Sequence, residues 1–301
     1  MKILLTGSNG QLGHAIRNTK PSFLGEEKID LLTMTRKELD LANPEKCKQI
    51  INQIKPDWVI NAAAYTAVDA AEDNKELAMT INGKAPKAIA EALLTTGGKL
   101  IQISTDFVFD GRTGSPIKTN HERNPLNAYG RSKAAAEEYL EERMIPHEKC
   151  VIIRTSWLMS HVGENFALTI VKLHKELENF SVVSDQVGSP TTTYSLSKAC
   201  WKLLERNVSG KELPAILHWC DAGAASWYDI AIAIGELGEE LGIINKKANV
   251  NSISTSDYLT KATRPGYSIL DCFNSRAILE LEPLNWRVSL KEIMENLARK
   301  E

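Results

Sequence analysis

A tyrosine and a lysine stand four residues apart in the segment YGRSK at 129–133. On a helix this spacing places the side chains of Tyr129 and Lys133 on one face. A phenol donates its proton poorly near neutral pH, because its ordinary pKa is about 10. A neighbouring ammonium, and the cationic ring of an oxidised nicotinamide, favour the phenolate and lower that pKa. The pair therefore predicts a general acid, although the same spacing also occurs on ordinary exposed helices.

A hydroxyl group follows an apolar segment upstream of this pair. Lys99–Ser104 reads KLIQIS, a predicted strand, and Thr105 and Asp106 come directly after it. Ligands of doubly wound folds bind at the carboxyl ends of the strands. Thr105 is therefore expected to hydrogen-bond a substrate oxygen and to position it for proton transfer from Tyr129.

Three glycines follow the first apolar segment of the chain, in the sequence GSNGQLG at 7–13. Gly7 permits a tight turn, Gly10 lets the backbone approach a pyrophosphate, and Gly13 lets a helix pack closely on the sheet. The free N–H groups of the helix then favour the anion. A position after a strand and before a helix is the context that a dinucleotide site requires. The alternative is a glycine-rich turn that binds nothing.

The end of the second apolar segment bears on the choice of cofactor. An acidic residue there would bind the 2′-hydroxyl of NAD, whereas this chain reads Met34-Thr35-Arg36. The planar guanidinium of Arg36 matches the oxygens of a 2′-phosphate. We therefore expect NADPH, with NADH as the alternative, because a solvent-facing arginine in a loop would give the same sequence.

These groups require a scaffold in which short strands alternate with helices. Helices are predicted over Asp69–Ile81 and Asn127–Arg143, among others. The strands are predicted at Lys2–Thr6, Ile29–Met34, Asp57–Asn61, Lys99–Ser104 and Cys150–Arg154. This alternation predicts an α/β fold with a Rossmann-type, doubly wound parallel sheet. The apolar character of the strands fits burial on both faces of the sheet.

The pattern becomes less regular in the second half, with a turn-rich stretch over Ser181–Thr193 and a closing helix over Ser289–Lys300. A chain of 301 residues is also longer than one compact core usually serves. We therefore predict two domains. They are an NAD(P)-binding domain over 1–155, to which roughly 190–222 returns, and a smaller, discontinuous α/β substrate-binding domain over 156–301.

Composition excludes several classes of protein. The chain has 36 Lys and Arg against 38 Asp and Glu, and a formal net charge of −2. This balance is unlike that of proteins that bind nucleic acid through its backbone, and no apolar stretch approaches the roughly 18 residues of a membrane span. The five scattered cysteines predict the reduced thiols of a cytoplasmic protein. The histidines form no HExxH motif, so no metal site is expected.

Several stretches together resemble the extended short-chain dehydrogenase/reductase superfamily and, within it, the dTDP-4-dehydrorhamnose reductases. They are LLTGSNGQLG (4–13), LDLANPE (39–45), NAAAYTAVDAAE (61–72), ISTDFVFDG (103–111), NPLNAYGRSK (124–133), RTSWL (154–158), SDQVGSPT (184–191) and TRP (263–265). That family reduces the 4-keto group of dTDP-4-dehydrorhamnose to dTDP-L-rhamnose with NADPH or NADH, for cell-surface polysaccharides. The resemblance implies the same reaction on a dTDP-sugar here.

The resemblance also implies roles for individual residues. Thr105, Tyr129 and Lys133 would form a catalytic triad, in which Lys133 also holds the nicotinamide ribose. The other cofactor contacts would be Gly10, Gln11 and Leu12 at the pyrophosphate, Asp40 and Leu41 at the adenine, and Ala64, Tyr65 and Thr66 after the third strand. The sugar nucleotide would be contacted by Thr105, Asp106, Trp157, Gln186 and Arg264. For Trp157 the alternative is an aromatic residue of the core.

Two positions depart from the family pattern. Phe107 stands where the family usually has a tyrosine, so one hydroxyl near the sugar is lost. Ala15 stands where some members have a glutamate that binds a magnesium ion between two subunits. We therefore expect no metal-bridged dimer, and both a monomer and a homodimer stay open.

Proteins with other functions share parts of this sequence pattern. A dehydratase of the same fold needs an Asp-Glu pair, but Asp106 is followed by Phe107. An epimerase would keep NAD bound through its whole cycle. A regulatory subunit similar to the methionine adenosyltransferase β subunit would keep the Tyr and Lys, but the RTSWL and SDQVGSPT stretches favour the reductase. A reductase of another nucleotide 4-keto-sugar is the remaining alternative.

Overall fold

The computed structural model describes residues 1–299, and its main element is a sheet of six parallel strands. Their order is β12 (Ile216–His218), β7 (Cys150–Thr155), β6 (Lys99–Thr105), β5 (Trp58–Asn61), β1 (Lys2–Thr6) and β4 (Asp30–Met34). Strand β4 pairs with one edge of β1, and β5, which comes later in the chain, pairs with the other edge. The structure therefore confirms the predicted doubly wound parallel sheet. The crevice in which such sheets bind ligands lies beyond the carboxyl ends of β1 and β5.

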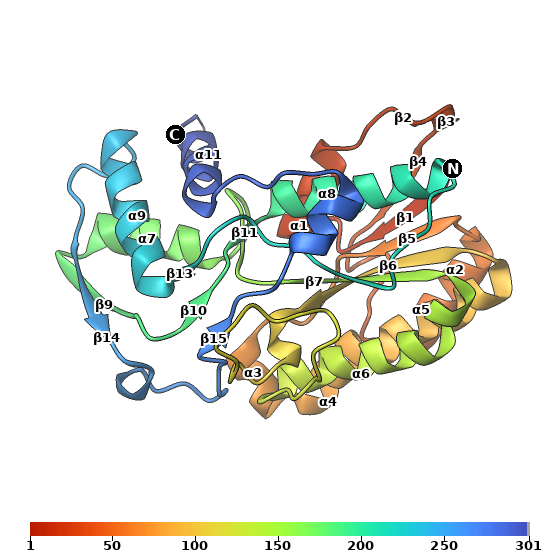
Figure 1. Cartoon of the computed structure of the whole chain (residues 1–301), viewed down its shortest axis with the longest axis horizontal. Coiled ribbons are helices and arrows are strands. Elements are labelled where there is room, and N and C mark those ends of the chain that lie inside the picture. Colours follow the sequence, from red (N-terminus) through yellow and green to blue (C-terminus); the bar gives the residue numbers. More distant parts are fainter. Residues whose placement is uncertain (300–301) are drawn as a thin grey trace.

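Helices cover both faces of this sheet (Figure 1). One face carries α1 (Gln11–Asn18) and α8 (Thr193–Val208), and the other carries α2 (Pro44–Ile54), α5 (Ala85–Thr96) and α6 (Ala128–Arg143). Strand β1 shows how the two faces divide, since Ile3 and Leu5 pack in the first core and Leu4 packs in the second. Both faces are buried, and for this reason the strands read as apolar runs rather than as alternating patterns.

Side-chain caps fix where the helices that matter for function begin. The Asn127 carboxamide oxygen accepts a hydrogen bond from the backbone N–H of Gly130 at 2.8 Å, which starts α6 one residue before Tyr129. Ser226 and Asp229 form a reciprocal capping box at the start of α9 (Trp227–Glu240). Each cap satisfies an N–H group that a helix terminus leaves free.

A second hydrophobic core lies beyond the carboxyl ends of the strands, at the left of Figure 1. It is built from α7 (Phe166–Glu176), α9 and α11 (Trp286–Ala298), and from the parallel pair β9 (Asn179–Val183) and β14 (Asn249–Ile253). Two small sheets join this unit to the first: β10 (Val187–Gly188) with β13 (Ala225–Ser226) and β15 (Tyr267–Ser268), and β8 (Leu158–Met159) with β11 (Thr191–Thr192). The remaining elements are β2 (Phe23–Leu24), β3 (Glu27–Lys28) and α10 (Phe273–Leu279).

Three predicted elements differ from the structure. The helix expected over Asp69–Ile81 is divided into α3 (Val68–Asp73), α4 (Lys75–Met79) and a π-helical turn at Thr80–Lys84, because Asn74 leaves the helical conformation. The turn-rich stretch from Ser181 begins inside β9, whose partner β14 is too distant in sequence for a local pattern to reveal it. The closing helix starts at Trp286, and its predicted last residue, Lys300, lies outside the described residues.

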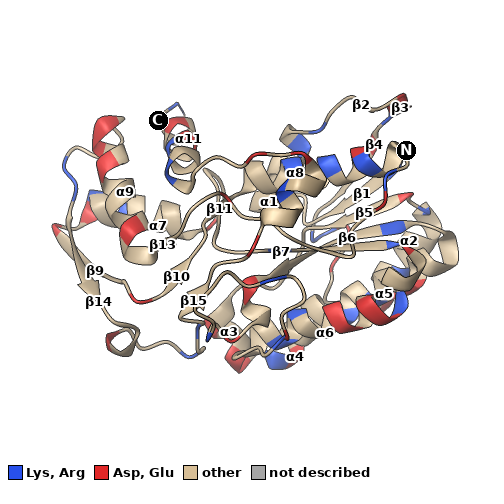
Figure 2. Ribbon diagram, in the orientation of Figure 1, with Lys and Arg blue, Asp and Glu red and all other residues tan. Residues whose placement is uncertain are grey.

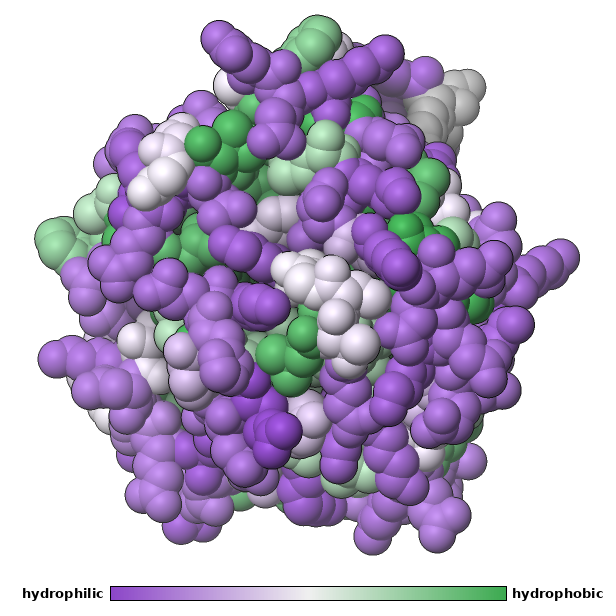
Figure 3. Space-filling view, turned by 90° about the vertical axis from the view of Figure 1, so that its right-hand side faces the viewer, coloured by the Kyte–Doolittle hydropathy of each residue, from purple (hydrophilic) through white to green (hydrophobic). Residues whose placement is uncertain are grey.

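The charged residues lie mostly on the outer helices. In Figure 2, α5 and α6 carry both acidic and basic residues, in keeping with a net charge of −2. Figure 3 shows the face at the right-hand end of Figure 1, where hydrophilic residues predominate and apolar residues form small separate patches. No helix within residues 1–299 is long and apolar enough to cross a membrane.

Candidate active site

Two adjoining cavities lie at the carboxyl edge of the six-stranded sheet. The larger, about 980 Å³, is bounded by the glycine loop and by the ends of β1, β5 and β6. The smaller, about 330 Å³, is bounded by the second unit. The residues that line both cavities are Asp106, Phe107, Trp157, Phe166, Trp227 and Arg264. These shared walls make the two cavities one site with two compartments.

The glycine loop forms a cradle at one end of the larger cavity. Gly7 has a φ of 63°, and a Cβ there would lie 2.8 Å from the Cα of Ala63. Gly10 is the N-cap of α1 without any side-chain cap, and the first turn of α1 contains no acidic residue. The first N–H groups of this helix, on Gln11 and Leu12, are therefore available to an anion. This cradle fits the pyrophosphate of a dinucleotide.

Gly13, unlike Gly7 and Gly10, lies outside the cavity lining. It does not line the larger cavity, and a Cβ there would lie 2.2 Å from the carbonyl oxygen of Gly7. Its role in this structure is the close packing of α1 on the loop. The predicted cofactor contacts Gly7, Gly10, Gln11 and Leu12 all line the cavity.

The side chain of Gln11 ties the glycine loop to the second unit. Its Nε2 donates to the carbonyl oxygen of Glu164 at 3.0 Å, and its Oε1 accepts from Nδ2 of Asn165 at 3.0 Å. Asn165 is also the N-cap of α7, and its Oδ1 accepts from the N–H of Leu168. Helix α7 lines the smaller cavity, so one side chain links the pyrophosphate cradle to the wall of the other compartment.

The opposite end of the larger cavity carries the predicted adenosine contacts. Arg36, Asp40 and Leu41 line it, and the Arg36 side chain is 78% exposed with its Nε 3.6 Å from Oδ1 of Asp40. An exposed pair of this kind is weak. The guanidinium is therefore free to meet a 2′-phosphate, and the donor set fits NADPH.

The segment after β5 is held by an asparagine that sequence reasoning missed. Ala64, Tyr65 and Thr66 line the larger cavity. The buried side chain of Asn82 accepts from the N–H of Tyr65 at 2.8 Å and donates to its carbonyl oxygen at 2.9 Å. Asn82 lies in the π-helical turn, a local distortion that no sequence pattern indicates.

Thr105, Tyr129 and Lys133 converge on the larger cavity. Tyr129 is 9% exposed and Lys133 is 4% exposed. The ammonium Nζ of Lys133 donates to the carbonyl oxygen of Ile103 at 2.7 Å, which fixes its position behind the end of β6. Strand β6 supplies Thr105, and α6 supplies the other two side chains one turn apart, as their spacing predicts.

The pKa of the phenol reflects its burial in the folded chain. Burial raises the pKa of Tyr129 to about 12, against the opposing effect of a hydrogen bond with Thr105. The lowering expected from Lys133 together with the cationic ring of an oxidised nicotinamide concerns the cofactor complex and stays a prediction. Burial likewise lowers the pKa of Lys133 to about 8. At neutral pH the phenol is thus protonated and the amine is mostly cationic, which is the state a proton donor needs.

Asp106 lies where the two cavities join. Its Oδ1 accepts from Oγ1 of Thr105 at 3.0 Å, whereas the buried Oδ2 makes no hydrogen bond of good geometry among the described residues. Burial raises the pKa of Asp106 to about 6. The Ser268 hydroxyl, which lines the smaller cavity, favours the charged carboxylate and offsets part of the effect of burial. A buried oxygen without a partner is costly unless a ligand supplies a donor. This oxygen fits a sugar hydroxyl.

Two stacked indoles form the aromatic wall between the cavities. The rings of Trp157 and Trp227 are 3.7 Å apart with an interplanar angle of 8°, and Phe166 packs on Trp227 with ring centroids 4.5 Å apart. Oε1 of Gln186, which lines the smaller cavity, accepts from Nε1 of Trp227 at 3.2 Å. Trp157 therefore lines both cavities and also packs, partly buried, against the second hydrophobic core. Sequence reasoning missed Trp227 and Phe166, since a single aromatic residue at a helix start has no diagnostic spacing.

Arg264 completes the wall of both cavities. Its side chain is 22% exposed, and its Nη1 and Nη2 donate to the Asp69 carboxylate at 3.1 and 2.5 Å. Of the other predicted sugar-nucleotide contacts, Asp106, Trp157 and Gln186 line the smaller cavity, whereas Thr105 lines only the larger one.

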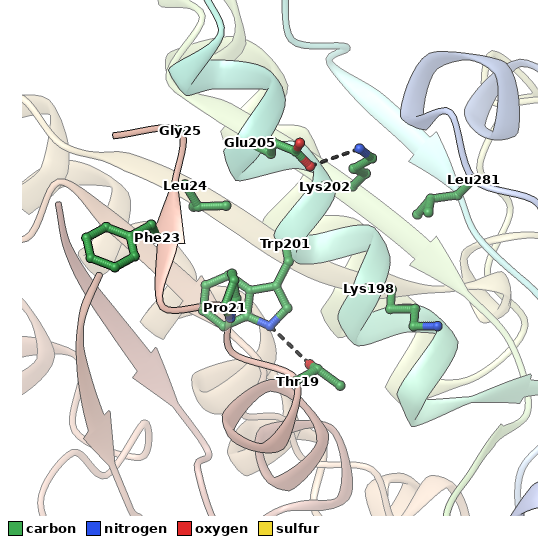
Figure 4. A pocket seen from close by; sticks show the side chains of 10 residues that line it. All are labelled: Thr19, Pro21, Phe23, Leu24, Gly25, Lys198, Trp201, Lys202, Glu205 and Leu281. Atoms are coloured by element: carbon green, nitrogen blue, oxygen red, sulfur yellow. Dashed lines mark hydrogen bonds and ion pairs between the residues drawn. The ribbon is translucent and has the colours of Figure 1, made fainter. Parts of the chain in front are cut away.

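A third cavity, of about 340 Å³, lies apart from these two, between α8 and the segment that follows α1 (Figure 4). Two pairs of its polar side chains interact with each other. Nε1 of Trp201 donates to Oγ1 of Thr19 at 3.1 Å, and Lys202 pairs with Glu205 at 2.9 Å. This cavity shares no lining residue with the other two and therefore lies outside the two-compartment site.

Comparison with known proteins places the chain in a family. The model of the RmlD substrate binding domain family matches residues 1–299. A dTDP-4-dehydrorhamnose reductase of Aggregatibacter actinomycetemcomitans is 33% identical over 97% of this chain and 98% of its own. Two solved dTDP-4-dehydrorhamnose reductases superpose with TM-scores of 0.86: that of Clostridium acetobutylicum (36% identity, 99% of each chain) and that of Bacillus anthracis, in complex with NADP (34% identity, 98% of this chain, 99% of that one). The chain belongs to the RmlD family of dTDP-4-dehydrorhamnose reductases.

Proposed function

We propose that this protein uses NADPH to reduce the 4-keto group of dTDP-4-dehydrorhamnose, giving dTDP-L-rhamnose. The observation that carries the proposal is the convergence of Thr105, Tyr129 and Lys133 beside the junction of two cavities. Relatives of the same length bear the name of this reductase, and one of them was solved with NADP.

The larger cavity would hold the cofactor. Gly7, Gly10, Gln11 and Leu12 would receive the pyrophosphate, and Arg36 would receive the 2′-phosphate. The adenosine side would be completed by Asp40 and Leu41, and the nicotinamide side by Ala64, Tyr65, Thr66, Tyr129 and Lys133. Bound there, NADPH supplies a hydride, and the protein supplies orientation and electrostatics.

The proton comes from Tyr129. Its phenol is protonated at neutral pH and would donate to the oxygen of the former carbonyl group. Thr105 would hydrogen-bond the same oxygen and fix its direction. The Lys133 ammonium, fixed by the Ile103 carbonyl oxygen 2.7 Å away, would stabilise the phenolate that remains.

The smaller cavity would hold the sugar nucleotide. Oδ2 of Asp106 would accept from a sugar hydroxyl, and Trp157 with Trp227 would provide an apolar wall. Gln186 would add polar contacts. The Arg264 guanidinium would bind the diphosphate, for which its planar donor fork is suited.

The two binding functions are assigned to different parts of the chain. We propose a cofactor-binding domain over 1–155, joined by roughly 190–222, and a substrate-binding domain from the rest of 156–301. Strand β12 belongs to the six-stranded sheet and helix α8 packs on it, which supports this division.

The protein is proposed to act as a monomer or homodimer, which sedimentation analysis would distinguish. Within residues 1–299 no cluster of His, Cys, Asp or Glu is arranged for a metal ion.

The test is NADPH oxidation with nucleotide 4-keto-6-deoxy sugars generated in situ. Oxidation with the dTDP sugar, faster than with UDP or GDP analogues, is the expected result. Preference for another base would replace this substrate with a different nucleotide sugar. No oxidation with any of them would reject the reductase in favour of a non-catalytic binding role. Firmly bound NAD in the purified protein would instead favour an epimerase.

A further inference from the structure

An irregular segment at 261–264, between β14 and β15, forms part of the site yet belongs to neither a helix nor a strand. Its position depends on contacts with α3. The Asp69 carboxylate accepts from Nη1 and Nη2 of Arg264 and also from the backbone N–H of Ala262 at 3.0 Å. One carboxylate therefore holds both the side chain and the backbone of this segment.

A second anchor joins the segment to the helix of the general acid. Nδ2 of Asn127 donates to the carbonyl oxygen of Thr263 at 2.8 Å, while Oδ1 of the same side chain caps α6 at Gly130. Tyr129 lies in the first turn of this helix. The segment that carries Arg264 is thus hydrogen-bonded to α6, the helix of Tyr129, on one side and to α3 on the other.

The chemistry of the pair explains why Asp69 matters. A guanidinium has five N–H donors in one plane, and a carboxylate bound to two of them fixes that plane while leaving other donors free. The hydrogen bond with Arg264 also lowers the pKa of Asp69, so the carboxylate is charged at neutral pH. A long side chain that is held in place before binding loses less conformational entropy when its ligand arrives.

We propose that Asp69 is a positioning residue for the nucleotide diphosphate. It holds Arg264 and the segment 261–264 in the orientation that receives the ligand, and it does not itself touch the ligand. This inference rests on the proposed function, because it takes the ligand of the smaller cavity to be a nucleoside diphosphate sugar.

The test compares Asp69→Ala with Asp73→Ala. Asp73 lies on the same helix and pairs with Lys261 of the same segment, but Lys261, unlike Arg264, lines neither cavity. Because a lost charged hydrogen-bond partner typically weakens binding by about tenfold or more, Asp69→Ala should raise KM for the sugar nucleotide by about that factor. The turnover number and the Kd for NADPH should change by less than about twofold, and Asp73→Ala should leave all three near wild type.

Two further variants separate positioning from simple loss of structure. Asp69→Glu keeps the carboxylate and should restore part of the affinity, while Arg264→Lys keeps the charge but loses the fork. The double variant Asp69→Ala/Arg264→Lys should be no weaker than Arg264→Lys alone, because both act through one interaction. If Asp69→Ala fails to fold, the isosteric Asp69→Asn takes its place.

Calorimetric binding of dTDP gives a readout that does not depend on reduction. The expected result is a Kd for dTDP that rises with Asp69→Ala and in parallel with KM. An unchanged Kd, additive effects in the double variant, or an equal loss of NADPH affinity would overturn the role of Asp69. Wild-type protein that binds dTDP but oxidises no NADPH would instead reject the proposed function and leave this role intact.

Discussion

The two compartments of the site are held together in different ways. On the cofactor side, the ligand-facing groups follow buried parallel strands directly, as Gly7 follows β1 and Thr105 ends β6. On the substrate side, the walls are made by pairs of side chains from distant segments. Trp157 stacks on Trp227 of another element, and Arg264 is held by Asp69, which is 195 residues away in the chain.

Because of this difference, substitutions on the two sides should have different effects. Backbone geometry on the cofactor side depends on a sheet that is buried on both faces, so single side chains there govern cofactor affinity or the proton transfer itself. The substrate side depends on individual pair contacts. A change there should alter KM for the sugar nucleotide and leave the cofactor unaffected.

The largest effect should come from Tyr129→Phe, which removes the proton donor alone. We expect the turnover number to fall by about 10²–10⁴-fold, the range for a lost general acid. The Kd for NADPH, measured by fluorescence titration, should stay near wild type. Tyr139→Phe is the matched control, because it removes a phenol on the same helix that pairs with Glu91 instead of facing the cavity. Near-normal turnover of Tyr129→Phe would refute the assignment.

The next effect concerns Asp106, at the junction of the two compartments. Burial raises its pKa from 3.8 to about 6, so between these pH values the folded protein holds a proton that the unfolded chain has lost. The stabilisation from this proton is complete below the unfolded pKa and is lost as pH rises through about 6. It amounts to about 3 kcal/mol, at 1.36 kcal/mol for each pKa unit.

Urea unfolding of wild type and Asp106→Asn between pH 4.5 and 7.5 would measure the larger part of this difference, about 2 kcal/mol. The variant should gain stability relative to wild type as pH rises, since it has no carboxyl group to ionise at that buried position. Parallel pH profiles for the two proteins would contradict the raised pKa.

A smaller effect is expected from Trp227→Ala on the substrate side. Loss of the stacked ring removes about 0.5–1.5 kcal/mol beyond its buried area, so KM for the sugar nucleotide should rise by about two- to tenfold. The Kd for NADPH should change less than this KM, although Trp227 also lines the larger cavity, because its stacking partner and Phe166 face the smaller one as well. Trp227→Phe keeps an aromatic partner for Trp157, so its KM for the sugar nucleotide should lie between those of wild type and Trp227→Ala. If both constants changed equally, the two compartments would not be energetically separate.

The smallest effect is expected from Arg36→Ala on the cofactor side. Because the side chain is 78% exposed, salt screens its charge, and KM for NADPH should rise by only about tenfold or less. KM for NADH should be unchanged, since that cofactor lacks the 2′-phosphate. Lys37→Ala removes the neighbouring charge and serves as the control. Equal effects of the two variants would mean that Arg36 contributes only general charge.

The parts of the site that sequence reasoning predicted are those with local patterns. The glycine loop, the end of β6 and the Tyr129–Lys133 pair each lie within a few residues of the element that positions them. Their positions in the structure match that reasoning, although the binding roles of single residues stay predictions. Gly13 is the exception among the predicted cofactor contacts, because it packs the helix and does not line the cavity.

The parts that were missed depend on packing between distant segments. Asn82, Trp227 and Asp69 acquire their roles only when separate elements meet, and no spacing in the sequence marks them. The rise in the pKa of Tyr129 on burial also depends on packing, because the degree of burial is a property of the folded molecule. Sequence patterns indicate which chemical groups are present, whereas the surrounding structure sets their acidity.

The stacked indoles of Trp157 and Trp227 have an optical consequence. Parallel rings 3.7 Å apart couple their electronic transitions, and such coupling is visible in circular dichroism and in quenched fluorescence. This pair lines both compartments, so a ligand that shifts either ring would change the signal without any added label. The protein therefore contains its own spectroscopic reporter of ligand binding at the junction of the two cavities.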